Sequence, residues 1–169
     1  MTSGPLTRAE LFEKLADMGI ATTTVEHPPA FTVEDVSGIA DGLPGAHTKN
    51  LFLKSEDGDL VLVVAKSSTN VDLKHLAKRL GVGRFSFGKP DLLMQHLGVT
   101  PGSVTAFAIA NDRSGRVKLV FDQELTRAES INCHPLENTA TTNIARDDLL
   151  RFIRGAGREP RIMSLTAAG

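Results

Sequence analysis

The sequence predicts an α+β fold, with a central mixed, largely antiparallel sheet flanked by helices. The chain has 169 residues, a length that suits one domain with a sizeable core. Segments of helical and strand periodicity are interspersed, and tight turns join several neighbouring strands, which argues against a doubly wound sheet. No repeat or interdomain linker is visible. We therefore expect one domain over 1–169, with its core at about 7–155.

The first three predicted elements are a helix, a strand and a short helix. Residues 7–18 carry a capping box formed by Thr7 and Glu10 and a single apolar face, which together predict a helix. Residues 21–27 are rich in β-branched side chains and predict a strand, which two prolines end. The acidic start of 32–39 favours a short second helix.

A hairpin and two helices are predicted next. Apolar runs at 50–54 and 60–65 flank an Asp-Gly dipeptide, which is typical of a tight hairpin turn. Residues 72–80 place their leucines on one face and are followed by a glycine that can end a helix. Residues 89–98 begin with proline and aspartate, which suit the first turn of a helix.

The last third of the chain predicts strands and one more helix. Residues 103–110 and 116–122 flank a polar turn and suggest a second hairpin. A further strand is expected at 129–136 and a final helix at 147–154. The tail after Gly155 lacks periodic apolar residues, so we expect it to be flexible and loosely held.

Composition excludes several classes of protein. Apolar residues make up 41% and charged residues 23%, and the net charge is -1, so any nucleic-acid contact must come from a local patch. One cysteine cannot form an internal disulfide, no signal-peptide pattern begins the sequence, and no apolar run approaches the roughly 20 residues of a membrane span. We expect a cytoplasmic protein with no membrane contact.

Common catalytic and cofactor motifs are absent. The sequence has no phosphate-binding glycine loop, no zinc-protease motif and no nucleophile elbow. The five histidines show no metal-ligand spacing among themselves. We therefore expect neither a metal nor a cofactor.

Two polar stretches are candidates for a site. Lys49 and Asn50 precede an apolar run, where they are either a solvated strand end or a cation and an amide that hold an ester carbonyl or a phosphate oxygen. His134 lies between Cys133 and Pro135, either in a simple turn or at the rim of a site. Because neighbouring strand residues point to opposite faces, Cys133 and His134 cannot form a dyad, and a buried, inert thiol is expected.

A basic segment is the third candidate. Residues 74–89 carry five cations and no acid, in a protein whose net charge is close to zero. Such a segment is either a solvated helix face or an edge that binds phosphates. With Lys54 from the preceding hairpin, the cations we expect to contact phosphates are Lys54, Lys74, Lys78, Arg79 and Arg84.

These stretches together resemble the YbaK/ProX family of trans-editing aminoacyl-tRNA deacylases. The resemblance is carried by "HTKNLFLKSEDGDLVLVVA", "VTPGSVTAFAIANDRSGRVKLVFD" and "INCHPLENTATTNIARDDLLRF", and it covers about 7–155. Within the family the chain is most similar to the prolyl-tRNA editing branch. The resemblance implies a single α+β domain that hydrolyses alanine from mischarged proline tRNA, without a metal or cofactor.

The resemblance also implies roles for individual residues. Lys49 and His134 would be catalytic, with Lys49 orienting the 3′ end of the tRNA and His134 holding the ribose or the attacking water. The expected substrate-binding residues are Thr48, Asn50, Phe52, Cys133 and Pro135. In the family the small loop often begins with glycine, and Cys133 takes that place here. The pocket would be walled by apolar residues, with Phe52, Leu53, Val64 and Phe107 as candidates.

Other functions stay open at this stage. The substrate can instead be Cys-tRNA(Pro) or another small aminoacyl-tRNA, and a non-catalytic nucleic-acid-binding module is a further alternative. The absence of Trp and Tyr counts against a binder that stacks bases on exposed aromatic rings. Expected partners are mischarged tRNA and either prolyl-tRNA synthetase or an elongation factor, for a protein that is a monomer or a weak homodimer.

Overall fold

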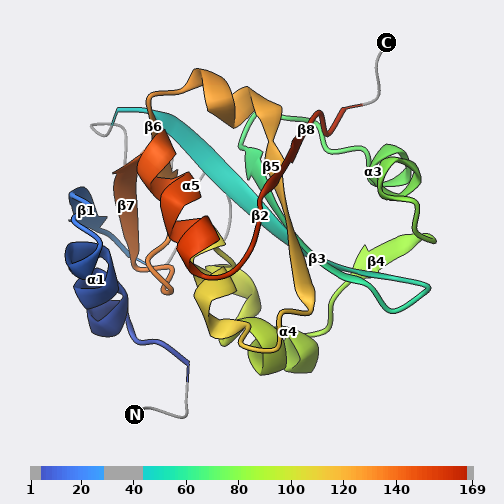
Figure 1. Ribbon diagram of the computed structural model, residues 1–169, viewed down its shortest axis with the longest axis horizontal. Helices are drawn as coiled ribbons and strands as arrows, with labels where there is room; N and C mark the ends of the chain where they lie inside the picture. The colour runs from blue at the N-terminus through green and yellow to red at the C-terminus, as the bar shows by residue number, and fades with distance from the viewer. Residues whose placement is uncertain (1–4, 29–43, 167–169) are drawn as a thin grey trace.

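A mixed eight-stranded sheet organises the fold (Figure 1). The computed structural model describes residues 5–28 and 44–166. The strands are β1 (Thr22–Glu26), β2 (Ala46–Ser55), β3 (Leu60–Lys66), β4 (Phe85–Phe87), β5 (Val117–Asp122), β6 (Ser130–Cys133), β7 (Ala140–Ala145) and β8 (Arg161–Met163). The helices are α1 (Arg8–Asp17), α3 (Leu73–Leu80), α4 (Pro90–Leu97) and α5 (Arg146–Gly155), with 3-10 helices η1 (Pro101–Ser103), η2 (Ala106–Asn111) and η3 (Gln123–Arg127).

The strand order is β1-β7-β6-β2-β3-β5-β8. β4 also pairs with β2, on the same edge as β6 but at the other end of the strand. The pairs β1–β7, β6–β7, β2–β3 and β2–β4 are antiparallel. The pairs β2–β6, β3–β5 and β5–β8 are parallel. The predicted α+β class with a mixed, largely antiparallel sheet is confirmed.

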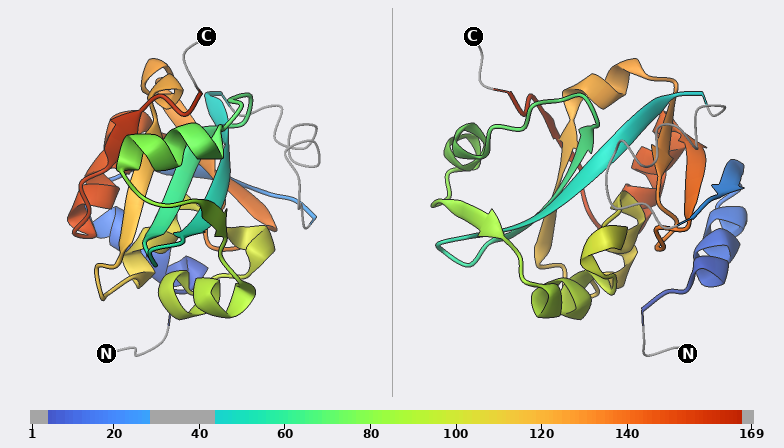
Figure 2. Two further views of the ribbon diagram at one scale, coloured as in Figure 1. Left: turned by 90° about the vertical axis from the view of Figure 1, so that its right-hand side faces the viewer. Right: turned by 180° about the vertical axis from the view of Figure 1, so that it is seen from behind.

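Two hydrophobic cores lie on opposite faces of the sheet. The main core joins one face to residues of α1, α4, α5 and η2, which lie on the viewer's side or at the lower edge of Figure 1. The second core joins the other face of β2, β3 and β5 to α3 and β4 (Figure 2, left). The strand β2 contributes to both cores, so its alternate side chains point in opposite directions. In the described part of the chain, no helix has the length and apolar character needed to cross a membrane.

Local sequence signals account for most helices and for the first hairpin. Thr7 and Glu10 form both bonds of the capping box at α1. Asp72 caps α3 by accepting a hydrogen bond from the His75 N–H, and Gly81 ends that helix in the left-handed conformation. β2 and β3 form the predicted hairpin, although β2 begins at Ala46, earlier than expected. The short helix predicted at 32–39 lies outside the described residues.

The prediction of a strand at 103–110 is wrong. This segment forms η1 and η2, and the Thr105 side chain caps η2 at the Phe107 N–H. β3 occupies one edge of β5, β8 pairs with the other edge at Val120–Asp122, and the Arg158 side chain binds the Val117 carbonyl, so little of that edge is left for a hairpin partner. The apolar run of 106–109 is instead buried as a helical turn against the main core.

The C-terminal segment is part of the sheet and the core. β8 pairs with β5, and Met163 and Leu165 are 5% and 1% exposed in the second core. Arg158 donates hydrogen bonds to the backbone oxygens of Val117 and Asp112 and pairs with the Asp112 carboxylate. Residues 158–165 are therefore held by specific contacts, in contrast to the loosely held tail that we expected.

Candidate functional site

The side chains of Lys49 and Asn50 point to opposite faces of β2. Lys49 pairs with Ala65, which belongs to the second core, and Asn50 pairs with Val64, which belongs to the main core. The register between β2 and β3 is continuous from Thr48 to Lys54, so no bulge turns either side chain. The two side chains therefore do not act together on one face as the expected pair of a cation and an amide. The Asn50 Oδ1 atom is buried and has no hydrogen-bond partner among the described residues.

Several of the predicted pocket residues are buried in the two cores. Phe52, Val64 and Phe107 belong to the main core, whereas Leu53 belongs to the second. Phe107 is fully buried and makes an edge-to-face contact with the ring of Phe152, with the ring centroids 5.4 Å apart. These side chains stabilise the fold from within it.

Thr48 and Cys133 lie together on the main-core face. The Thr48 hydroxyl donates a hydrogen bond of 2.7 Å to the Asn132 carbonyl, and it lies 4.0 Å from Cys133 Sγ. Cys133 is 2% exposed, and burial raises the pKa of its thiol to about 12, although the hydrogen bond from Thr48 acts in the opposite direction. A thiol with that pKa is a poor nucleophile at neutral pH, which fits the inert cysteine expected from the sequence.

The register of β2 and β6, continued past its last pair, leads to Lys49 and His134. The parallel register of β2 and β6 pairs Ala46 with Ile131 and His47 with Asn132. Continuing it by two residues puts Lys49 beside His134, which directly follows β6. Neighbouring strands are about 4.8 Å apart. Two positions that are distant in the chain thus become neighbours.

One hydrogen bond sets the tautomer of His134. Its Nδ1 lies 3.2 Å from the Ala140 carbonyl oxygen. A carbonyl oxygen only accepts, so Nδ1 carries the proton and the neutral ring presents the lone pair of Nε2. Burial lowers the pKa of His134, the bond to Ala140 partly offsets this, and nearby His27 lowers it further. His134 is therefore a neutral hydrogen-bond acceptor at neutral pH.

The loop that carries His134 has an unusual backbone. Leu136 has φ 71°, in the left-handed region, and in the described part of the chain it is the one residue other than glycine with a positive φ. Such a conformation costs about 1–3 kcal/mol and persists where the surroundings hold it. Pro135 and Leu136 are both buried. The strained turn lets the chain reverse between β6 and β7 so that His134 faces the carbonyl of Ala140.

His27 is a further residue of this region, and we expected no role for it from the sequence. Its backbone N–H donates to the Thr139 carbonyl at 2.9 Å, and its Nε2 lies 2.8 Å from the Thr141 hydroxyl. These two bonds fix the residues on either side of Ala140, whose carbonyl orients His134. No local signal could reveal this, because the Thr141 partner is 114 positions away.

The face of β6 and β7 opposite the main core is polar. Asn143 Nδ2 donates to Asn132 Oδ1 at 3.1 Å, and both amides donate to the Pro44 carbonyl at 2.9 Å. By strand alternation, His47 and Lys49 share this face. The view from behind shows this side of the N-terminal part of β2 with no described helix in front of it (Figure 2, right).

The backbone of Asn50 points to a stretch of the β2 edge where no strand of the described residues pairs. β2 pairs with β6 at Ala46 and His47 and with β4 only from Leu53 to Ser55. The Phe52 carbonyl accepts a hydrogen bond from Gly88 on this edge. Strand residues two apart direct their backbone groups to the same edge. The N–H and C=O of Asn50 therefore face the interval between β6 and β4.

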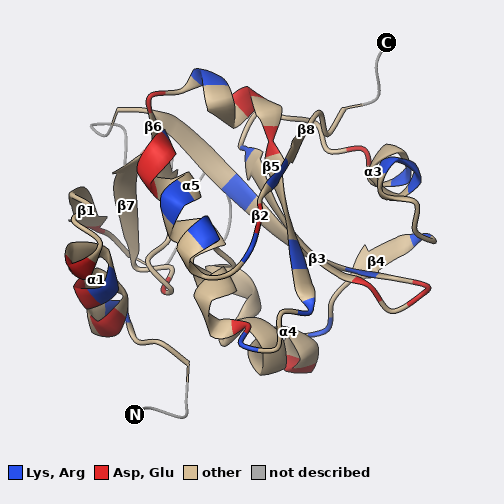
Figure 3. Cartoon of the chain, in the orientation of Figure 1, with Lys and Arg blue, Asp and Glu red and all other residues tan. Residues whose placement is uncertain are grey.

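Four of the five predicted tRNA contacts gather around β4. A cavity of about 550 Å³ is lined by Lys54, Arg84 and Lys89, and a second of about 650 Å³ by Lys74, Lys78 and Arg84. Figure 3 shows basic residues on α3 and acidic residues at the tip of the β2–β3 hairpin. Arg79 is exposed on α3 but lines neither cavity. Within 5–28 and 44–166, no group of three or more acidic, histidine or cysteine side chains is placed to hold a metal ion.

Comparison with known proteins identifies the family. The family profile described as "Aminoacyl-tRNA editing domain" matches residues 27–152. The chain belongs to the aminoacyl-tRNA editing family. The match covers β2, β6 and β7 and therefore includes both Lys49 and His134. The resemblance seen in the sequence is confirmed.

Relatives within this editing family span nearly the whole chain. A "Prolyl-tRNA synthetase associated domain-containing protein 1" from Danio rerio is 39% identical over 93% of this chain and 86% of its own length. The "Prolyl-tRNA editing protein ProX" from Acetoanaerobium sticklandii is 33% identical over 90% and 93%. A solved structure provisionally described as a trans-editing enzyme for prolyl tRNA synthetase shares the fold, with a TM-score of 0.73 at 17% identity over 96% of this chain and 99% of that one.

Proposed function

We propose that this protein hydrolyses the ester bond of mischarged prolyl tRNA in trans, with Ala-tRNA(Pro) as its substrate. The observation that carries the proposal is the parallel register of β2 and β6 in an aminoacyl-tRNA editing domain, which leads to Lys49 and His134 when it is continued past His47 and Asn132. The names of the relatives from Danio rerio and Acetoanaerobium sticklandii direct the proposal to prolyl tRNA.

The reaction needs a positioned water and a stabilised oxyanion. Water attacks the carbonyl carbon of the ester, the bond from that carbon to the ribose oxygen breaks, and the ribose oxygen takes up a proton. Alanine and a tRNA with a free terminal hydroxyl are the products. His134 Nε2 accepts a hydrogen bond from the water or from the neighbouring ribose hydroxyl, because its Nδ1 proton is committed to Ala140.

Two groups on β2 are suited to the carbonyl oxygen or the terminal phosphate. The Lys49 ammonium supplies a positive charge on the side of the sheet that carries the polar residues. The backbone N–H of Asn50 faces the unpaired edge and is a donor fixed by the strand. No protein nucleophile is needed, and the buried thiol of Cys133 is unsuited to that role.

Discrimination against proline follows from size. A synthetase pocket shaped for proline rejects a smaller side chain by only about 1–3 kcal/mol per missing methylene. A second, smaller pocket admits alanine and excludes proline by steric overlap. The cations around β4 then hold the acceptor stem through its phosphates, and this binding should weaken as salt rises.

The test is a panel of purified aminoacyl-tRNAs incubated with the protein. We expect release of alanine from Ala-tRNA(Pro), with Pro-tRNA(Pro) left intact. Lys49→Ala should lower the rate by about 100-fold or more, and Lys118→Ala should not, because Lys118 is 60% exposed on β5 and pairs with Asp59. Full activity of Lys49→Ala would remove the mechanism. Preferential release of cysteine would transfer the proposal to Cys-tRNA(Pro), and tRNA binding without any deacylation would favour a non-catalytic module.

A further inference from the structure

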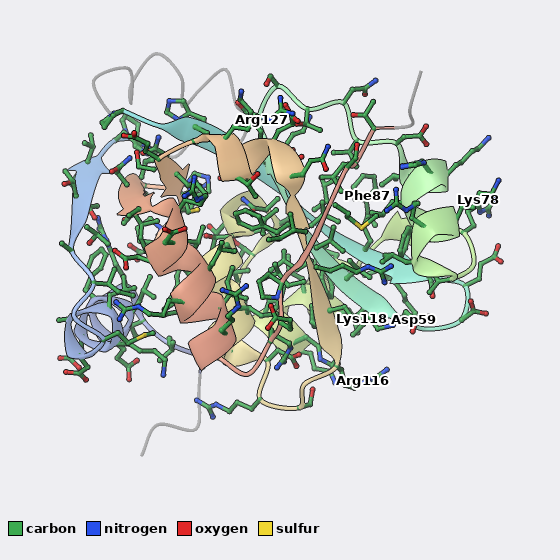
Figure 4. The ribbon with its side chains drawn as sticks, turned by 45° about the horizontal axis from the view of Figure 1, so that its top comes forward. Asp59, Lys78, Phe87, Arg116, Lys118 and Arg127 are labelled. Carbon is green, nitrogen blue, oxygen red and sulfur yellow. The ribbon has the colours of Figure 1, made fainter. Side chains whose placement is uncertain are left out.

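Phe87 is an aromatic side chain that the fold leaves in water. It is 64% exposed, whereas Phe52, Phe85 and Phe107 are each 8% exposed or less. It lies at the end of the molecule that carries α3 and Lys78 (Figure 4). Single exposed apolar side chains are common on protein surfaces, and it is the surroundings of this ring that set it apart.

Cations line the same cavity as this ring. The cavity of about 550 Å³ that Phe87 lines also contains Lys54, Arg84 and Lys89. Its acidic members are Glu56 and Asp91. Glu56 lies 3.8 Å from Arg84 Nε, but both side chains are more than half exposed, and such pairs contribute little. The positive side chains thus remain available to phosphates, and the adjoining cavity adds Lys74 and Lys78 without an acid.

The fold presents Phe87 on a fixed support. β4 pairs with β2 through three residue pairs, from Leu53↔Phe87 to Ser55↔Phe85. The next residue, Gly88, donates its N–H to the Phe52 carbonyl at 2.8 Å, and a Cβ at Gly88 would lie 2.3 Å from the Phe52 ring. Glycine at this position therefore lets the chain that follows β4 approach β2 closely enough to pair with it. Because β4 is held in the sheet, the Phe87 ring loses little conformational entropy when it binds a planar ligand.

Phe87 lies on the same side of β2 as Lys49. Leu53 and Phe87 are directly paired, so their side chains share a face, and Lys49 is four residues from Leu53 on that face. Four residues of strand span about 13 Å. Leu53 is fully buried in the second core, so an RNA strand whose esterified end lies at Lys49 reaches Phe87 by passing outside that core, over about 13 Å along β2.

We propose that Phe87 is a stacking platform for an unpaired base of the tRNA 3′ end, with Arg84 and Lys89 holding the adjoining phosphates. Base stacking on an aromatic ring tolerates any base and adds to the electrostatic attraction for the backbone. This inference rests on the proposed function for its ligand, and it adds a binding site about 13 Å from the reacting ester. It also explains how a chain without Trp or Tyr can bind single-stranded RNA by stacking.

The absence of Trp and Tyr permits a direct test. Phe87→Trp would carry the only tryptophan of the protein, so its fluorescence reports on this one site. We expect quenching on titration with deacylated tRNA(Pro) that has its full unpaired 3′ end, and none with the same tRNA trimmed to a blunt acceptor stem. Ile162→Trp, at a residue 43% exposed on β8, is the matched control and should not be quenched by either RNA.

Binding constants give a second measurement. Phe87→Ala should bind intact tRNA(Pro) about 5- to 150-fold more weakly than the unaltered protein, and Phe87→Tyr should bind normally. Hydrolysis of alanyl-adenosine, which is too short to reach β4, should be the same in all three. Circular dichroism confirms that each variant is folded.

Saturating binding without quenching of Phe87→Trp, equal quenching by the trimmed tRNA, or affinity of Phe87→Ala within twofold of normal would each overturn the proposal. If quenching occurs and no aminoacyl-tRNA is hydrolysed, the stacking site stands and the proposed hydrolysis fails. If Ala-tRNA(Pro) is hydrolysed without quenching, the hydrolysis stands and the stacking site fails.

Discussion

Removing one partner of the Asp112–Arg158 pair should be among the most destabilising single changes in this protein. The Asp112 side chain is 1% exposed and that of Arg158 is 13% exposed. Asp112 also accepts hydrogen bonds of 2.7 Å from the Val117 N–H and from the Ser114 hydroxyl. Asp112→Ala would leave a largely buried guanidinium without its counter-charge, which costs about 3–5 kcal/mol. The remaining bonds of Arg158 to backbone oxygens cannot replace that charge.

This cost converts to a measurable change in melting temperature. For a chain of this length, each kcal/mol shifts Tm by about 2–4 °C, so Asp112→Ala should melt about 6–20 °C lower. Urea unfolding should be followed by far-UV circular dichroism, because the protein has no Trp or Tyr. The matched control is Glu159→Ala, which removes an acid paired with Arg154 at 3.1 Å where both side chains are more than half exposed. That exposed pair should contribute less than about 1 kcal/mol.

The pH dependence of stability gives a second measure of the same pair. Burial opposes ionisation of Asp112, but the hydrogen bonds from Val117, Ser114 and Arg158 outweigh it and lower the pKa of this carboxyl group. A lowered pKa in the folded state stabilises the protein above the unfolded pKa of about 3.9, and this contribution is lost as pH falls through the folded value. The difference in free energy of unfolding between the unaltered protein and Asp112→Ala should therefore shrink below about pH 4. A difference under 1 kcal/mol at pH 7, equal to that of Glu159→Ala, would refute the reasoning.

Three further predictions follow from the site and from β4. Burial, together with His27, lowers the pKa of His134, so kcat/KM for deacylation should fall only when pH drops below the ordinary histidine pKa of about 6.5. In His134→Gln, kcat/KM should be lower by about 100-fold or more. If this variant showed the same fall of kcat/KM at low pH, the assignment of that fall to His134 would be contradicted. His27→Gln and Thr141→Val should each lower kcat by up to about 100-fold through misplacement of His134, while the affinity for deacylated tRNA stays constant; a loss of affinity with unchanged kcat would contradict a positioning role. Gly88→Ala should lower the free energy of unfolding by about 1–3 kcal/mol, because the added Cβ overlaps the Phe52 ring. An unchanged midpoint of urea unfolding would show that β4 shifts to make room for the added methyl group.

The sequence by itself determined the elements whose causes are local. Examples are the capping box at Thr7, the Asp-Gly turn of the β2–β3 hairpin and the leucine spacing of α3. In each, the interacting residues are only a few positions apart, so the local sequence pattern is enough to predict the structure. The motifs around Lys49 and His134 were likewise sufficient for the family.

Tertiary structure decided which partner each strand takes and which face each side chain joins. Residues 103–110 have the composition of a strand, but β3 and β8 occupy both edges of β5. Lys49 and Asn50 are adjacent in sequence and therefore point to opposite faces, but only the register with β3 shows that Lys49 lies on the face of the second core and Asn50 on the face of the main core. A period of two shows that side chains alternate without showing which of them point inward, because that choice depends on pairing energies between segments far apart in the chain. The bond from His27 to Thr141 is of the same kind, since only the folded sheet brings its two residues together.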